Sequence, residues 1–381
     1  MKFLYSHRTR SADGQWVHIS AMTDALMARG HDIEICGPGL EPGDTRLLSA
    51  GGKRGLSTLL PAQLYECVEY GYSFPAHHRL LRTATSFAPD VLYERYNLFF
   101  HAGVWLKRKL RLPMILEVNA PLAFERAQHG KLALKTFAKN SEAAIWRAAD
   151  KLLPVTNVLA DHLRAAGVAE DRIEVIQNGV GGDFLRAHDP SLIRERYGVS
   201  QKLVLGFTGF VRDWHGMDRV VRFLADHNKN DLYLLIVGDG PARASLEELA
   251  NELGVMHQMA FTGVVQRDAV AAHVAAFDVA LQPAVVGYAS PLKLFEYMAQ
   301  GKAIIAPDQP NIREVLTDGA DALLCASDNF EAALARLIDD ASLRARLGAA
   351  ARETLAARDY TWAGNAKRVE AIAEQLRSER P

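Results

Sequence analysis

The sequence has few cysteines, no long apolar segment and almost no net charge. Its three cysteines, Cys36, Cys67 and Cys325, are far apart and form no CxxC pair, which argues against a zinc ribbon or a disulfide framework. No stretch reaches the roughly 20 apolar residues of a membrane-spanning helix. The 44 Lys and Arg residues balance 45 Asp and Glu residues, so binding along nucleic acid is not expected. We expect a globular cytoplasmic protein, with attachment to the inner face of a membrane left open.

Three further patterns are absent. The first residues, MKFLYSHRTRSADG, are polar where a signal peptide needs 7–15 apolar residues. The turn after the first expected strand contains one glycine, Gly14, whereas a dinucleotide-binding turn follows G-x-G-x-x-G, and no G-x-x-x-x-G-K-[ST] loop occurs. An ordinary NAD dehydrogenase or NTPase is therefore not expected. Gly14 still precedes an expected helix whose amides attract anions, and a turn glycine without a ligand is the open alternative.

Short apolar runs alternate with amphipathic segments along the whole chain, which is typical of parallel sheets covered by helices on both faces. In the first half, the expected strands are 2–5, 32–36, 91–93, 114–118, 151–155 and 172–177. In the second half, they are 203–208, 232–237, 259–262, 279–282, 303–306 and 322–325. We expect two doubly wound, Rossmann-like α/β domains facing a central cleft, with bounds 1–185 and 186–362, and a last helix within 363–381.

The segment GYASPLKLFEYMAQG is typical of an anion-binding helix start. Ser290 suits the N-cap and Pro291 the first helical position. Free amides near Leu292, together with Lys293, can hold a diphosphate. Glu296, about one turn further on, offers acceptors to a pair of ribose hydroxyls. The open alternative is a solvated Lys293–Glu296 pair, which contributes only about 0.2–0.5 kcal/mol.

The segment FTGFVRDWHG contains a second basic group. Arg212 can bind phosphate oxygens in a bidentate manner, and His215 directly precedes an expected helix. Alternatively, Arg212 pairs with Asp213 or another loop carboxylate. Gly238, in the turn VGDGP, allows close backbone approach, although this is also an ordinary turn sequence.

In this order, the segments resemble the large retaining family 4 of glycosyltransferases, which have the GT-B fold. The matching pieces are FTGFVRDWHGMDRVV, LLIVGDGP, FTGVV and SPLKLFEYMAQGKAIIAPD, preceded by DGQWVHISAMTDALMARGHDIEICGPG, LEVNAPLAFE and RIEVIQNGV. The resemblance covers nearly the whole chain. It implies an acceptor-side domain at 1–185, a nucleotide-sugar-binding domain at 186–362, and a last helix that crosses back to the first domain.

The resemblance implies four catalytic residues. Arg212 and Lys293 would hold the donor diphosphate and stabilise the charge that grows on this leaving group. Glu117 and Asn119 would lie in a loop that faces the reacting sugar and the acceptor. Asn119 stands where the family frequently has a histidine.

The resemblance also implies a larger donor-binding set. Glu296 would bind the ribose, and the backbone near Val264 and Val265 would bind the base. Gly14 would lie near the diphosphate, with His18 on the helix behind it. The other implied members are His215 (where the family has a second phosphate-binding lysine), Gly238, Tyr288, Ala289, Ser290, Pro291 and Leu292.

The chain departs from the family pattern at Tyr288. The family has two glutamates separated by seven residues, of which Glu296 would be the second and position 288 the first. A carboxylate that contacts the hydroxyls of the donor sugar is therefore missing here or supplied from elsewhere.

The expected reaction is retaining transfer of a sugar from a UDP or GDP donor to a hydroxyl acceptor, in polysaccharide or glycoconjugate assembly, by front-face substitution. No cofactor and no essential metal are expected. A double displacement needs two carboxylates at the anomeric carbon, and only Glu117 is offered. Two alternatives stay open. One is a GT-B nucleotide-sugar 2-epimerase using Glu94, Glu117 or Glu125, and the other is a non-catalytic nucleotide-sugar-binding protein, suggested by Tyr288.

Residues 101–139 are strongly basic, with eight Lys and Arg residues against two glutamates. The interleaved Leu132, Leu134 and Phe137 add apolar character. Such a strip can contact anionic lipid and receive a lipid-linked glycan acceptor. The alternative is an ordinary solvated basic surface.

Overall fold

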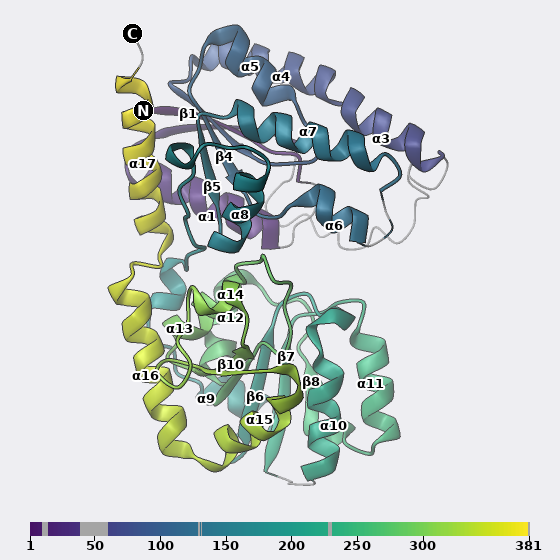
Figure 1. The fold of residues 1–381 in the computed structure, drawn as a ribbon. Coiled ribbons are helices and arrows are strands. Elements are labelled where there is room, and N and C mark those ends of the chain that lie inside the picture. Colours follow the sequence, from purple (N-terminus) through teal and green to yellow (C-terminus); the bar gives the residue numbers. More distant parts are fainter. Residues whose placement is uncertain (10–13, 39–59, 129, 131, 228–230, 380–381) are drawn as a thin grey trace. The chain divides into compact units, whose positions relative to one another are not determined.

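The computed structural model describes residues 1–9, 14–38, 60–128, 130, 132–227 and 231–379. The chain folds into two compact α/β units (Figure 1). The first comprises Met1–Gln177, Tyr288–Ser290 and Trp362–Pro381, and the second comprises Asn178–Gly287 and Pro291–Thr361.

The first unit contains a five-stranded parallel sheet with the order β2-β1-β3-β4-β5. All residues of β3 and β4 are buried, as is typical of central strands covered on both faces. The strands are β1 (Lys2–Ser6), β2 (Asp32–Cys36), β3 (Val91–Arg95), β4 (Met114–Val118) and β5 (Lys151–Pro154).

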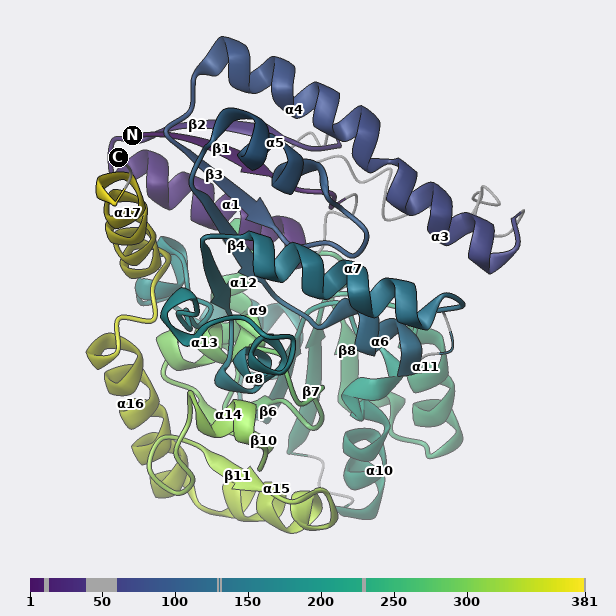
Figure 2. The same cartoon turned by 45° about the horizontal axis from the view of Figure 1, so that its top comes forward.

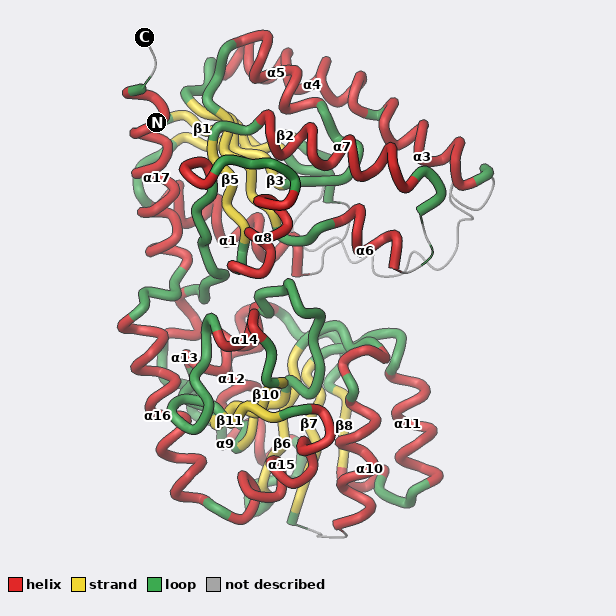
Figure 3. The backbone as a smooth tube through the Cα atoms, viewed as in Figure 1, coloured by secondary structure: helices red, strands yellow, loops and turns green. Residues whose placement is uncertain are grey.

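Helices cover this sheet on both faces (Figure 3). One apolar core joins the sheet to α4, α5, α7 and α8, while α17 packs along α1 (Figures 1 and 2). The helices are α1 (Gly14–Ala28), α3 (Ala62–Gly71), α4 (Ser73–Phe87), α5 (Ala102–Leu110), α6 (Leu122–Gln128), α7 (Lys135–Ala148), α8 (Asn157–Ala165) and α17 (Trp362–Ser378).

The second unit contains a six-stranded parallel sheet with the order β11-β10-β9-β6-β7-β8. Alternate strand residues enter two separate cores: Phe207 faces one, and Val204 and Leu235 face the other. The strands are β6 (Leu203–Thr208), β7 (Leu232–Val237), β8 (Met259–Phe261), β9 (Val279–Leu281), β10 (Ala303–Pro307) and β11 (Leu323–Cys325).

Helix α9 precedes the first strand of the second unit, and the other helices follow its strands. Some starts are fixed by side-chain caps, such as Asp340, whose carboxylate accepts a hydrogen bond from the Leu343 amide at 2.8 Å. The helices are α9 (Ser191–Arg196), α10 (Met217–His227), α11 (Arg243–Glu252), α12 (Arg267–Ala275), α13 (Leu292–Ala299), α14 (Pro310–Arg313), α15 (Phe330–Asp339) and α16 (Ala341–Ala357).

The structure confirms the expectation of two α/β domains with parallel sheets. One expected strand is wrong. Residues 172–177 run beside β5, where the amides of Glu174 and Ile176 donate to β5 carbonyls, but only Ile173 forms a bridge, so no strand results. Within the described residues, no helix is long and apolar enough to cross a bilayer.

Candidate functional site

The loop that follows β6 in the second unit carries a neutral histidine. His215 is buried, and its Nδ1 accepts a hydrogen bond from the Arg212 amide at 3.0 Å. Burial, with the nearby charges of Lys293 and Arg212, lowers the pKa of His215 to about 3. Because Nδ1 is an acceptor in this neutral ring, the proton lies on Nε2, which can donate to an anion.

Lys293 lies in the first turn of α13, beside the same aromatic ring as His215. Its Nζ is 3.6 Å from the centroid of Phe207, and the His215 ring is 5.0 Å from it. Burial lowers the pKa of Lys293 to about 7, although the Glu296 carboxylate opposes this shift. An anion bound at Nζ would favour the protonated amine.

The start of α13 differs from the expectation by one residue. Pro291 is the N-cap and Leu292 the first helical residue, so Ser290 is not the N-cap. The Ser290 hydroxyl instead donates to Gln177 Oε1 at 3.1 Å. The N-terminal amides of α13, followed directly by Lys293, still form a local environment that favours an anion.

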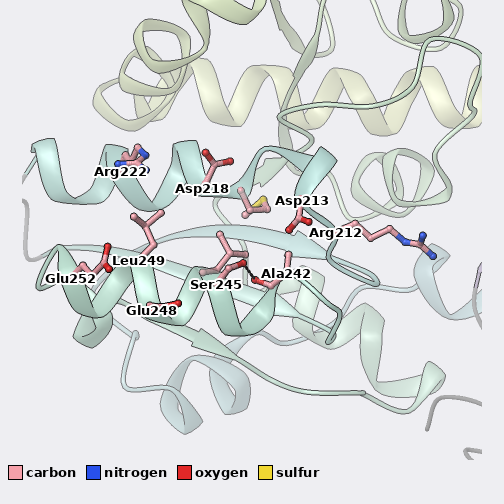
Figure 4. Close-up of a pocket in the computed structure, with 11 residues that line it drawn as sticks. Arg212, Asp213, Asp218, Arg222, Ala242, Ser245, Glu248, Leu249 and Glu252 are labelled. Atoms are coloured by element: carbon pink, nitrogen blue, oxygen red, sulfur yellow. Dashed lines mark hydrogen bonds between the residues drawn. The ribbon is translucent and has the colours of Figure 1, made fainter. Parts of the chain in front are cut away.

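Arg212 is exposed, with its guanidinium 5.3 Å from the Phe210 ring. In the described part of the chain it forms no ion pair with Asp213 or another carboxylate. Figure 4 shows its guanidinium pointing away from the other residues around it. Arg212 therefore retains its hydrogen-bond donors for a ligand.

Gly238 allows the loops after β6 and β7 to pack backbone to backbone. Its φ is 139°, and a Cβ at this position would lie 2.2 Å from the Gly209 carbonyl oxygen. The Gly238 amide donates to Thr262 Oγ1 at 3.1 Å, which joins a third loop, after β8. The three loops at the carboxyl ends of these strands thus form one local structure, where ligands of open α/β sheets bind.

Glu296, Val264 and Val265 also lie in this unit. Burial raises the pKa of Glu296, while Arg267 and Lys293 oppose the rise. Val264 is 65% exposed, whereas Val265 packs against the core. Arg267 could not be predicted from the sequence, because a single cation at a helix start has no distinctive local pattern.

The remaining site residues belong to the first unit. Glu117, at the end of β4, is 2% exposed and is contacted by many donors. Burial raises its pKa, but His18, Arg95 and hydrogen bonds outweigh this and hold the pKa below its usual range. The side chains that donate to its carboxylate or pair with it are Tyr5, His18, Tyr93, Arg95 and Asn119.

This arrangement makes Glu117 an anchor for its neighbours. Its Oε1 is 3.3 Å from Nδ1 of His18, and it accepts a hydrogen bond from Asn119. A cavity of about 10 Å3 beside Glu117 and His18 has room for about one water molecule. Gly14 is the exposed first residue of α1, while its neighbours 10–13 lie outside the described residues.

Tyr288, at the sequence position of the family's first glutamate, contacts a carboxylate of the first unit. Its hydroxyl donates to Glu125 Oε2 at 2.6 Å, and its carbonyl accepts from Thr156 Oγ1 at 2.9 Å. Ala289 and Ser290 complete this short segment of the first unit. Glu125 was not identified as the partner of Tyr288, because 163 residues separate them.

A pocket of about 310 Å3 lies between α10 and α11 (Figure 4). Only Arg212 and Asp213 belong both to this pocket and to the loop after β6. Its lining carries four carboxylates against two arginines, so its charge does not suit a diphosphate. Elsewhere in the described ranges, no three His, Cys, Asp or Glu side chains gather as a metal site requires.

Two protein-family models together match most of the chain. Residues 13–179 match the model of the Glycosyl transferase 4-like domain, and residues 191–354 match that of Glycosyl transferases group 1. A GDP-mannose-dependent alpha-mannosyltransferase of Mycolicibacterium smegmatis is 26% identical over 348 residues, covering 89% of this chain and 87% of that protein.

Two further proteins are similar. A 2-deoxystreptamine glucosyltransferase of Streptomyces kanamyceticus is 31% identical over 179 residues, so the match spans 45% of this chain and less than half, 44%, of that relative. The crystal structure of Anabaena Alr3699/HepE in complex with UDP superposes with a TM-score of 0.76 at 15% identity, covering 98% of this chain and 100% of that one. The chain therefore belongs to the group 1 glycosyltransferases and has the GT-B fold.

Proposed function

We propose that this protein transfers a sugar from a UDP or GDP donor to a hydroxyl group of a glycan or lipid-linked glycan, with retention of anomeric configuration. The observation that carries the proposal is the group of Lys293, Arg212 and neutral His215 around the start of α13. A diphosphate satisfies such a group, because it supplies acceptors for the two cations, the Nε2 proton and the helix amides.

The donor is held through its diphosphate and its ribose. Lys293, Arg212 and His215 contact the diphosphate oxygens, and Glu296 accepts from the ribose hydroxyls. The backbone near Val264 binds the base. Both bases stay within the proposal, because a relative is named as GDP-mannose-dependent and a structure with the same fold contains UDP.

The reaction proceeds by front-face substitution. The acceptor oxygen forms a bond to the anomeric carbon as the bond from that carbon to the diphosphate oxygen breaks, and the acceptor proton passes to the departing diphosphate. Lys293 and Arg212 stabilise the negative charge that grows there. Glu117 supports this route over a glycosyl-enzyme intermediate, since its carboxylate is buried and engaged by Arg95 and Asn119. No metal is required, which remains a prediction.

The surroundings of the candidate acid and base carboxylates argue against a 2-epimerase. Glu94 is buried, accepts from the Ser6 hydroxyl at 2.8 Å, and has its pKa raised to about 8 by burial. Glu125 accepts from Tyr288, and Glu117 is enclosed. Glu94 and Glu117 are enclosed, and Glu125, which is only partly buried, is engaged by the Tyr288 hydroxyl. A general base must reach the proton that it removes, so these surroundings favour transfer over epimerisation.

Product analysis tests the proposal. UDP- and GDP-sugars are incubated with monosaccharide and alkyl-glycoside acceptors, and nucleotide release and the anomeric configuration are followed by NMR. We expect an α-linked product from an α-linked donor. Lys293→Met and Arg212→Ala should each lower turnover by about 10²–10³, while Arg352→Ala, an exposed arginine of α16, should not. Inversion of configuration would contradict the mechanism, and a 2-epimer formed without acceptor would identify an epimerase.

A further inference from the structure

Four helices of the first unit contribute one ring each to an exposed aromatic cluster. The cluster consists of Tyr70 from α3, Phe74 from α4, Trp105 from α5 and Phe137 from α7. Trp105 is 4.9 Å from Phe74 and 6.4 Å from Tyr70 between ring centroids, and Tyr70 is 5.4 Å from Phe137. Phe74 is 62% and Phe137 38% exposed. Joined apolar exposure of this kind marks an interaction surface.

The helices around the cluster expose charge of one sign. No exposed carboxylate occurs on α4, α5 or α7, because α4 and α5 have none and Glu142 of α7 is buried. On α3, Glu66 is buried and accepts from the Ala133 and Leu134 amides, and Glu69 pairs with Arg126 at 2.8 Å. Seven exposed cations remain on α4, α5 and α7: Arg79, Arg82, Arg108, Lys109, Lys135, Lys139 and Arg147.

This segregation contrasts with the whole chain, whose formal net charge is −1. In both views α3, α4, α5 and α7 lie on one flank of the first unit (Figures 1 and 2). Arg108 and Lys109 follow Trp105 by three and four residues, so they share its face of α5. Cations beside partly exposed aromatic rings match an interface with anionic headgroups.

The surface differs from the basic strip expected from residues 101–139. Leu132 is buried, so it is not available to lipid. Lys107 donates to the Ala148 carbonyl and pairs with Asp150, and Arg126 pairs with Glu69. The exposed apolar groups come instead from the aromatic cluster, half of which precedes residue 101.

We propose that the aromatic cluster and its surrounding cations bind the surface of a membrane that contains anionic phospholipid. The rings enter the headgroup region while the cations contact lipid phosphates. The inference does not depend on the proposed transfer reaction, because it involves only the first unit.

Vesicle flotation tests the proposal. The full-length protein is mixed with phosphatidylcholine vesicles, or with vesicles in which about a third of the lipid is phosphatidylglycerol. We expect binding to the anionic vesicles only, and release at about 1 M salt, where the screening length falls to roughly 3 Å. Arg108→Gln with Lys109→Gln should weaken binding about 25-fold, since each cation contributes about 1 kcal/mol, roughly fivefold.

Paired variants separate the cluster from general effects. Phe74→Ser with Phe137→Ser should abolish flotation, whereas Leu192→Ser, an exposed leucine of α9, with Arg352→Gln should not. Equal thermal midpoints would show that all variants are folded. Absence of flotation, equal flotation with both vesicles, or equal loss in the control pair would overturn the proposal. Light scattering that shows a dimer dissociated by Phe74→Ser would identify a second copy of the chain as the partner instead.

Discussion

At the scale of single residues, the candidate site contains two basic groups whose pKa values are strongly lowered by their surroundings. Lys293 has a pKa of about 7 because burial disfavours its charged form. His215 is neutral, since burial and two neighbouring cations lower its pKa to about 3. A diphosphate would therefore meet His215 as a neutral donor throughout the neutral pH range, and Lys293 as a donor whose charge depends on pH.

The low pKa of Lys293 predicts that nucleotide affinity depends on pH. Above pH 7 the free amine is neutral, so diphosphate binding must take up a proton, and the association constant should fall about tenfold per pH unit between pH 7 and pH 9. Lys293→Arg keeps its charge and should remove this slope. Calorimetric titration with UDP and GDP at several pH values measures the slope for the wild type and for Lys293→Arg. An unchanged slope in Lys293→Arg would contradict the assignment of Lys293 to the diphosphate.

At the scale of elements, the bounds of apolar strands could be predicted from the sequence, whereas the pairing of one segment with another could not. The bounds 114–118 and 203–208 coincide with β4 and β6, because continuous apolar runs between turns identify buried strands. Residues 172–177 contain β-branched residues among polar ones, and whether they complete a ladder depends on β5, which local sequence does not reveal. Helix α13 was expected at its place, with an error of its N-cap only.

For the site too, residues within short motifs could be predicted, whereas contacts between distant segments could not. Arg212, Lys293 and Glu296 could be proposed because they lie in short motifs. The Phe207 ring beside Lys293, and Glu125 at the Tyr288 hydroxyl, come from distant segments. Their contacts depend on tertiary packing, so no spacing in the sequence indicates them.

Gly238 provides a test at this scale. In Gly238→Ala, the Cβ would lie 2.2 Å from the Gly209 carbonyl oxygen, so the loops after β6 and β7 must separate. We expect a stability loss of roughly 1–3 kcal/mol, together with weaker nucleotide binding. Gly254→Ala is the matched control, because its φ is 71° but no atom lies within 4 Å. It should lower the thermal midpoint without changing nucleotide affinity. Equal nucleotide affinity in both variants would show that the loops after β6 and β7 do not form the nucleotide site.

At the scale of the whole molecule, the first unit is assembled from three stretches of chain, and Gln177 joins them. Its side-chain oxygen accepts from the Ser290 hydroxyl at 3.1 Å, and its carbonyl accepts from Asn365 Nδ2 at 2.8 Å. All three residues are buried, where such hydrogen bonds are strongest. The segment Tyr288–Ser290 is therefore part of the first unit, although it directly precedes the helix that carries Lys293 in the second.

The most direct test of the account is a thermal-shift titration of the full chain with UDP, GDP, ADP and their sugar conjugates. We expect one nucleotide family to raise the thermal midpoint, with about 2.7 kcal/mol of added stability at 100 times its dissociation constant. Arg212→Ala combined with Lys293→Met should remove this shift, whereas Arg352→Ala should retain it. A wild-type protein that responds to none of these ligands, or a double variant that responds as the wild type does, would contradict the assignment of the diphosphate site.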